Sequence, residues 1–401
     1  MGNYGKDTQH YFITSSASSY ASYINTAMSE WVNTTSSMGV TTLFLTTKPQ
    51  QQSSSRMDIY QVSTVNEWWG LTTMYNGSTE VDPFSSNWAW GKIQLDADFS
   101  DLSENKRLAV IAHEMGHVMG LAHSDFSNVL MRADIAYNSS STSRAQTNDL
   151  GGINYLYNVG GSKMKKIGIR ILGCMALLSM VGCGRIEGAS VQDLSNTKDA
   201  IVESETTLAE NNNEYSNKNS LFYSDISSYE IFTDVNSEAA LKNLYYNIDD
   251  FIDSDSSDVI VKGNIIEIEY VYIDGCSYSV LTVDVERAYK GEVQETITVY
   301  EDGGYTRLSD EKEQIEAHAD LSQYTEEEME NLLINHTFMG AEHSNVGDTV
   351  ILFLKTNEGS ILGDSYRINC SVFGRYTLNK DSYIRPEFIV ENDNPEKNNN
   401  I

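Results

Sequence analysis

Hydrophobic and polar positions in the first 160 residues predict a domain of mixed α and β structure. Between residues 19 and 32, apolar and aromatic side chains recur every three or four positions, which is the spacing of a helix with one buried face. Runs rich in β-branched and aromatic residues predict strands at 9–14, 41–46 and 57–63, and residues 91–96 alternate apolar and polar side chains. Helices and strands mixed within one segment favour an α+β fold.

The chain beyond residue 222 follows a different pattern, in which strands separated by turns dominate. The polar stretch 187–222 that precedes it is rich in Asn, Ser and Glu and predicts a flexible tether. We expect short helices around 238–251 and over 325–334. The expected strands are 259–268, 279–289, 295–300, 348–354 and 366–376. The pattern therefore predicts a mainly β domain over residues 223–401.

A short apolar run with a basic start separates the two parts at residues 163–186. Its apolar stretch, between Arg170 and Arg185, is shorter than the roughly 20 residues of a membrane-spanning helix. A basic start, a short apolar run and a Gly-Cys end are typical of a signal peptide, which we favour over a permanent transmembrane helix. The Met-Val-Gly-Cys sequence that ends at Cys183 resembles a bacterial lipobox, in which the cysteine is lipidated. This resemblance implies membrane anchoring through residues 164–183.

The charge of the chain changes at the same place. Residues 1–162 have a net charge of −6, residues 163–186 of +5 and the remainder of −29, within a total of −30. We interpret this break as two proteins joined end to end, by gene fusion or a lost stop codon. Because the first expected strand begins close to residue 1, a missing upstream segment or a composite product are alternatives. The acidic balance disfavours nucleic acids and anionic lipid surfaces as partners.

The stretch from His113 to His123 carries the candidate chemistry. His113 and His117 are four residues apart, so on a helix they project from one face and can bind one metal ion. Glu114 lies beside the first histidine, where its carboxylate can hold and deprotonate a metal-bound water. On a continuous helix His123 would lie about 15 Å along the axis from His113, too far for zinc–nitrogen bonds of about 2.0–2.1 Å. Gly120 can adopt the positive φ of a helix end, so we expect the chain to turn back there and supply His123 as a third zinc ligand.

The same residues resemble the extended motif of the metzincin metallopeptidases, His-Glu-x-x-His-x-x-Gly-x-x-His followed by a methionine turn. The Gly-Leu-Ala-His-Ser sequence that ends at Ser124 is similar to the matrixin subfamily. Met131 is similar to the methionine of the Met-turn, which forms an apolar floor beneath the metal; a simple core methionine is the alternative. Asp149 is similar to the matrixin aspartate that supports this turn. The resemblance covers roughly residues 8–160.

This resemblance implies that residues 1–162 are a zinc metallopeptidase domain with a twisted mixed sheet, an active-site helix and a C-terminal helix. It also implies an edge strand above the cleft that pairs with an extended substrate, and we assign this strand to residues 91–96. The chain departs from the family in three places. His10 is the only other histidine before residue 160, so no second, structural zinc site is expected. Arg-Ala-Asp follows Met131 where Tyr-Pro is common, and no cysteine precedes the motif for a thiolate-type propeptide lock.

Acidic residues close to the motif have local interpretations. Asp101 and Glu104 are spaced as a capping pair for the active-site helix. Asp96 and Asp98 are candidates for a calcium site, because carboxylates are the ligands that calcium prefers. Solvated acids at a strand end are the interpretation that we favour for these two.

The second part of the chain offers no assembled active site. His318, His336 and His343 lack the spacing of ligands to one metal ion. Cys276 and Cys370 are the only cysteines outside the signal-like segment. The sequence is equally compatible with a disulfide between them and with two free buried thiols.

Two functions of different classes follow from these patterns. The first is a zinc endopeptidase for protein or peptide substrates, in which Glu114 activates the zinc-bound water and later passes its proton to the leaving amine. The second is a bacterial surface lipoprotein that binds a ligand, with the peptidase segment inactive or a passenger. We favour the enzyme for residues 1–162 and leave the rest as a binding or structural module. We expect an extracytoplasmic location, secreted or at the cell surface.

Overall fold

The computed structural model describes residues 9–32, 44–46, 52–83, 86–124, 126, 129–133, 144–157, 220–245, 247–253, 256–357 and 360–386. All of these residues belong to one compact unit. The signal-like segment 163–186 with Cys183, and the predicted tether up to residue 219, lie outside the described residues. Of the helices that the structure describes, none combines the length and the apolar composition needed to cross a membrane.

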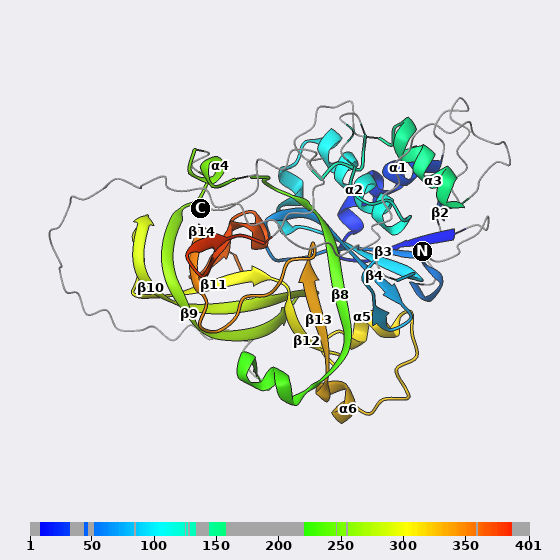
Figure 1. The fold of residues 1–401 in the computed structure, drawn as a ribbon. Helices are drawn as coiled ribbons and strands as arrows, with labels where there is room; N and C mark the ends of the chain where they lie inside the picture. The colour runs from blue at the N-terminus through cyan, green and yellow to red at the C-terminus, as the bar shows by residue number, and fades with distance from the viewer. Residues whose placement is uncertain are drawn as a thin grey trace, which may run out of the picture. The chain divides into compact units, whose positions relative to one another are not determined.

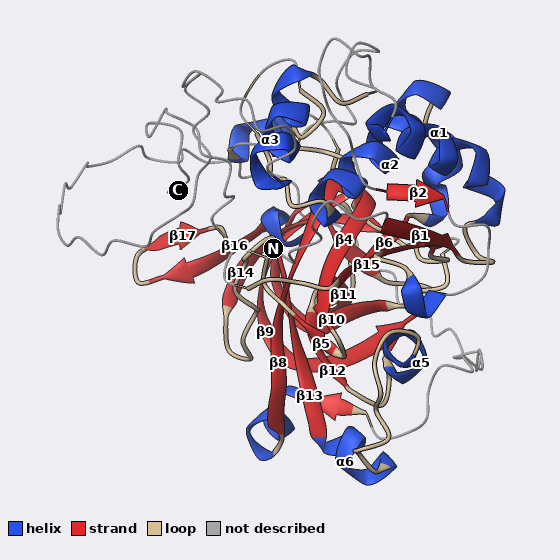
Figure 2. Cartoon of the chain, turned by 90° about the vertical axis from the view of Figure 1, so that its right-hand side faces the viewer, coloured by secondary structure: helices blue, strands red, loops and turns tan. Residues whose placement is uncertain are grey.

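Residues 9–157 form a mixed sheet with helices gathered on one side of it (Figure 2). Four strands run parallel in the order β2-β1-β3-β6, and β4 is added antiparallel to β6. The helices α1 and α2 share one hydrophobic core with the sheet, in which Trp31 and Ile111 are fully buried. The elements of this part are β1 (Gln9–Ile13), α1 (Ala21–Val32), β2 (Phe44–Thr46), β3 (Met57–Gln61), β4 (Trp68–Asn76), β5 (Thr79–Glu80), β6 (Trp90–Leu95), α2 (Glu104–Val118) and α3 (Thr147–Tyr157).

The predicted edge strand at 91–96 is wrong. This segment is β6, which lies between β3 and β4 and is buried at all six positions. Alternation of side chains identifies a strand but does not identify its neighbours in the sheet, which is why the sequence misplaced it. The strands at the two ends of this part of the sheet are β2 and β4, and β4 was not predicted from the sequence.

Residues 220–386 are mainly β structure. Strands β9 and β10 form a long hairpin through Asp274 and Gly275, both of which have positive φ, as a tight two-residue turn requires. The pairings β9–β10–β11–β15–β14 return to β9 and close a ring of five strands. The elements are β7 (Leu221–Phe222), β8 (Glu230–Leu241), α4 (Ile248–Asp253), β9 (Val259–Ile273), β10 (Cys276–Lys290), β11 (Thr296–Asp302), β12 (Gly304–Arg307), α5 (Lys312–Glu316), α6 (Glu326–Asn331), β13 (Leu332–Phe338), β14 (Thr349–Thr356), β15 (Tyr366–Ile368), β16 (Arg375–Asn379) and β17 (Ser382–Ile384).

Two helices predicted in this part are confirmed over only part of their length. Residues 238–241 belong to β8, and the helix expected around 238–251 is reduced to α4, which begins at Ile248. The helix expected over 325–334 starts with a capping box between Thr325 and Glu328 but ends at Asn331. In both places, pairing with a strand from elsewhere in the chain overrides the local preference for helix.

Strand β8 connects the two parts of the chain in one sheet. It pairs antiparallel with β4 on one side and parallel with β13 on the other. The sheet therefore runs β12-β13-β8-β4-β6-β3-β1-β2, without a break between the peptidase-like strands and the later ones (Figure 1).

Candidate metal centre and active site

The end of α2 positions the candidate ligands. The helix ends at Val118, and Gly120 has a φ of +104°, in the region that glycine adopts without steric cost. The Leu121 N–H donates to the Gly116 carbonyl (2.9 Å) and the Gly120 N–H donates to the His117 carbonyl (2.8 Å). These two bonds form a Schellman motif, which reverses the chain and returns it towards the helix.

Three histidine nitrogens converge at this turn. Nε2 of His113 lies 3.0 Å from Nε2 of His117 and 3.2 Å from Nε2 of His123. On a tetrahedral zinc ion with bonds of about 2.0–2.1 Å, such nitrogens would lie about 3.4 Å apart. The spacing fits a zinc ion bound by all three side chains, and their ligand atoms form a group that could hold a metal.

Two main-chain carbonyls fix the tautomers of the first two histidines. Nδ1 of His113 lies 2.9 Å from the Leu130 carbonyl, and Nδ1 of His117 lies 2.9 Å from the Leu121 carbonyl. A carbonyl oxygen only accepts, so each Nδ1 donates and each Nε2 presents a lone pair to the centre. Burial lowers the pKa of His117 and of His123 well below the usual value, so both are neutral and able to bind a metal.

A carboxylate that was not predicted from the sequence lies beside the second ring nitrogen of the third histidine. The Glu238 carboxylate, on β8, lies 3.5 Å from Nδ1 of His123. A carboxylate at the second nitrogen of a ligand histidine orients the ring and strengthens the ligand. Glu238 lies in a segment without any motif, so no sequence signal could have identified it.

Glu114 is fully buried beside the histidines. Its Oε2 accepts a hydrogen bond from Oγ1 of Thr72 on β4 (2.6 Å), and a Cβ atom at Gly70 would lie 2.7 Å from its Cγ. Only glycine at position 70 therefore leaves room for this carboxylate. Burial raises the pKa of Glu114 to about 8, against the opposing effect of the Thr72 hydrogen bond. The carboxyl group can thus exchange a proton close to neutral pH, as a general acid or base must.

Met131 and Asp149 pack beneath the end of α2. Met131 is buried, and a Cβ atom at Gly116 would lie 2.3 Å from its sulfur. The Asp149 carboxylate accepts the backbone N–H groups of Leu130 (2.8 Å), Met131 (3.2 Å) and Gln146 (2.7 Å). Since the Leu130 carbonyl also holds His113, this carboxylate connects α3 to a candidate metal ligand through one residue.

The acids before α2 have different roles from those expected. Asp96 is fully buried and pairs with Nζ of Lys242 (2.8 Å), which also lies 3.6 Å from Asp98. The favoured interpretation of solvated acids is wrong for Asp96, which is buried in an ion pair, whereas the Asp98 side chain is 42% exposed. The capping pair of Asp101 and Glu104 is wrong, because the N-cap residue is Ser103.

Among the described residues, those of the second part make several buried polar contacts. Cys276 and Cys370 are free and buried. Nε2 of His336 lies 2.6 Å from Glu311, and its Nδ1 lies 3.5 Å from Glu80, in a group with metal-like spacing. Burial and the Glu311 charge raise the pKa of Glu80 in this cluster to about 8. The sequence did not reveal it because its members come from distant segments.

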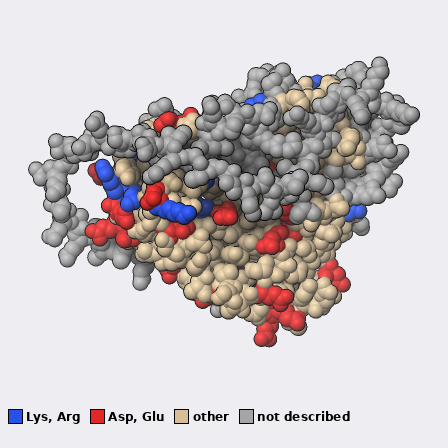
Figure 3. Space-filling model, viewed as in Figure 1, with Lys and Arg blue, Asp and Glu red and all other residues tan. Residues whose placement is uncertain are grey.

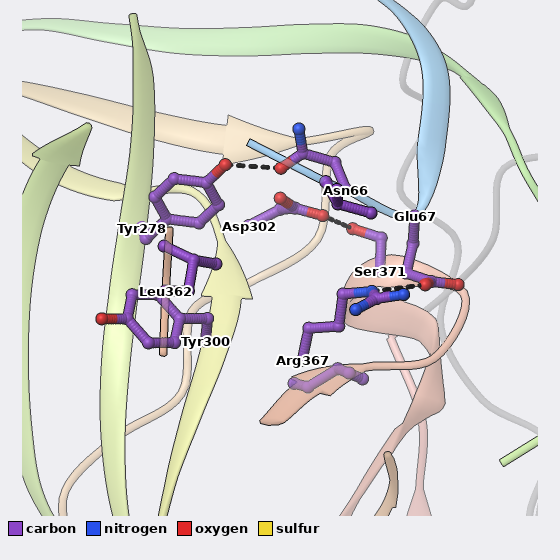
Figure 4. Close-up of a pocket in the computed structure, with 10 residues that line it drawn as sticks. Asn66, Glu67, Tyr278, Tyr300, Asp302, Leu362, Arg367 and Ser371 are labelled. Carbon is purple, nitrogen blue, oxygen red and sulfur yellow. Dashed lines mark hydrogen bonds and ion pairs between the residues drawn. The ribbon is translucent and has the colours of Figure 1, made fainter. Parts of the chain in front are cut away.

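A small polar pocket lies where the loop before β4 meets the later strands (Figure 4). Glu67 is fully buried and accepts hydrogen bonds from Arg367 (2.8 Å) and Lys355 (3.1 Å). Asp302 accepts one from Ser371 (2.5 Å). The Glu67 charge is compensated by these two cations, and the contacts join the loop before β4 to the later strands.

Comparison with known proteins agrees with this geometry. Residues 15–158 match the family model of the matrixins. No curated protein matches the chain. The match supports a matrixin-like metallopeptidase domain over these residues, which contain all three histidines and Glu114, and it leaves the later part of the chain unassigned.

Proposed function

We propose that residues 15–158 act as a zinc-dependent endopeptidase that hydrolyses peptide bonds in proteins. The observation that carries this proposal is the convergence of three Nε2 lone pairs beside the fully buried carboxyl group of Glu114. A zinc ion bound there would polarise a peptide carbonyl and lower the pKa of a water molecule. Glu114 would take the proton of the attacking water and pass it to the leaving amine. Thr72 would hold the carboxyl group in position through its hydrogen bond.

Metal content and cleavage test this proposal in the full chain. We expect one zinc ion for each chain, and His123→Ala should lower zinc affinity sharply while α2 stays folded. Cleavage of an unfolded protein should be lost with a chelator and return with added zinc. Glu114→Ala should keep its zinc and lose about 10²–10⁴-fold in rate, the usual contribution of a general base. A zinc-loaded Glu114→Ala protein that cleaves at the wild-type rate would rule out the role of this carboxylate.

We also propose an extracytoplasmic location, supported by the lipobox-like sequence that ends at Cys183. Cells that make the protein should incorporate labelled fatty acid into it, and Cys183→Ala should abolish the label. A protein that partitions into the membrane equally with and without this cysteine would contradict lipidation at this position.

A further inference from the structure

The family resemblance implies that an extended substrate binds at an edge strand above the cleft; the strand beside Glu114 at such an edge is β4 and not residues 91–96, and β8 is paired to it. Strand β4 lies at one edge of the peptidase-like part of the sheet, and residues 68–72 of its outer edge pair with β8. The two strands pair antiparallel, with Thr72 opposite Glu238 and Gly70 opposite Ala240. Thr72 and Gly70 both lie against Glu114, so β8 pairs with β4 directly beside the candidate active site.

Side chains of β8 alternate between the active site and the rest of the second part. Ala240 is fully buried in the core that contains α1 and α2, whereas Ala239 and Leu241 are buried in a separate core with Phe353 and Tyr376. Glu238, on the same face as Ala240, reaches His123. One face of β8 thus covers the candidate metal centre, and the other face packs into the core of the second part.

With β8 in this position, most of the candidate site is closed to solvent, and His123 keeps 12% of its side chain exposed. Glu114 and His113 are 0% exposed and His117 is 2% exposed. Two further contacts hold the strand along β4: Oγ1 of Thr73 lies 3.0 Å from Oγ of Ser237, and the Lys242 N–H donates to the Glu67 carbonyl (2.7 Å).

We propose that residues 230–241 are a built-in inhibitor of the peptidase: β8 occupies the edge of β4 at which a substrate would bind, and it must leave that edge before cleavage. This inference rests on the proposed function, because it assigns the second part of the chain a role at the same site. The occupant resembles a substrate in being an extended antiparallel strand, and Glu238 places a carboxylate next to the third histidine.

A bulky substitution on the inner face of β8 tests the proposal in the full chain. Ala240→Arg introduces a long charged side chain into the core beside α2 and should displace β8 from β4. We expect a quenched fluorescent peptide to be cleaved at least tenfold faster by this variant than by the wild type. Ile231→Arg, on the same strand at a position that is 41% exposed, is the matched control and should cleave within twofold of the wild type.

Zinc release separates failure of this inference from failure of the proposed function. In Ala240→Arg, amides of β4 should exchange faster with solvent, and EDTA should remove zinc at least tenfold faster than from the wild type. Faster exchange and zinc loss without any cleavage would retain the covering role of β8 and overturn the peptidase function. Faster exchange in β4 with wild-type rates of zinc loss and of cleavage would overturn the inhibitory role.

A reversible crosslink gives the same answer without disturbing the fold. Thr73→Cys combined with Ser237→Cys replaces two hydroxyl groups in contact, so oxidation should lock β8 onto β4. The oxidised protein should cleave the peptide at least tenfold more slowly than the same protein after reduction, and Thr73→Cys alone should show no such difference. Equal rates for the oxidised and reduced forms, with the crosslink verified by mass spectrometry, would overturn the proposal.

Discussion

Hydrogen bonds from ring nitrogens to main-chain carbonyls prepare two histidines for zinc before any metal binds. Because the Leu130 and Leu121 carbonyls accept from Nδ1, His113 and His117 are each held in the tautomer that exposes Nε2. The Leu130 carbonyl is in turn fixed by Asp149, which accepts the N–H of the same residue. Geometry at the metal centre therefore depends on residues that do not touch the metal.

Asp149→Ala should weaken both folding and zinc binding. The substitution leaves three backbone N–H groups without their acceptor, and each buried unsatisfied group costs about 1–3 kcal/mol. We expect the free energy of unfolding to fall by about 3 kcal/mol and zinc affinity to fall about 10–100-fold, as for other residues that support a ligand. Denaturant titration and competition with a zinc chelator measure the two effects. Asp98→Ala, with a side chain that is 42% exposed, is the control and should change neither.

Gly116→Ala tests packing against helix propensity at a single position. Alanine inside a helix is favoured over glycine by about 1 kcal/mol, but overpacking a core costs about 1–3 kcal/mol. Because the new Cβ would lie 2.3 Å from the Met131 sulfur, we expect a net loss of stability in denaturant titration. Adding Met131→Ala should cost less than the sum of the two single changes. A gain in stability from Gly116→Ala would show that Met131 moves aside freely.

At the scale of elements, the sequence predicted best where chemistry and local geometry coincide. The turn at Gly120 follows from the need to bring His123 back to His113, and the helix does end two residues before this glycine. Neighbours in the sheet could not be predicted in this way, because β4 and β8 pair with each other although they lie far apart in the sequence. Ala239-Ala240-Leu241 reads as helix in isolation, and only its pairing with β4 makes it a strand.

Lys242→Met should show how much the ion pair just after β8 contributes to the stability of the fold. The substitution leaves the fully buried Asp96 without its ammonium partner, and removal of one member of a buried ion pair costs about 3–5 kcal/mol. We expect a loss near the lower value at pH 7, because backbone N–H groups of Asn66 and Asp98 still bind the carboxylate. The loss should shrink at pH 5, since burial raises the pKa of Asp96 and the acid can then take up a proton.

The control for this prediction is Lys262→Met. Lys262 also pairs with a carboxylate, that of Glu286, but the two side chains are 30% and 40% exposed. Exposed ion pairs contribute little to stability, so denaturant titration should detect no change in this variant. Equal effects of the two substitutions would mean that the Lys242 pair is not buried in solution.

At the scale of the whole molecule, acidic charge is spread over the surface and also enclosed within it. Asp and Glu outnumber Lys and Arg on the visible face, and one group of acids lies over α6 at the lower end (Figure 3). The net charge of −30 means that repulsion at the surface grows as pH rises. Buried acids such as Asp302 also lower the stability of the fold as pH rises, because their charged forms lose hydration inside the protein.

Asp302→Asn separates these two effects. Burial raises the pKa of Asp302 from 3.8 to about 7, so the folded state keeps its proton where the unfolded state has lost it. The resulting stability is fully present below pH 3.8 and is lost as pH rises through 7. Between pH 4 and pH 8, the free energy of unfolding of the variant should therefore rise relative to that of the wild type. The rise should reach up to about 4 kcal/mol, at 1.36 kcal/mol for each pKa unit. Salt at 1 M should leave this difference in place while it weakens surface repulsion, because a buried carboxyl group is not screened. A difference that stays constant from pH 4 to pH 8 would mean that Asp302 ionises normally in the folded protein.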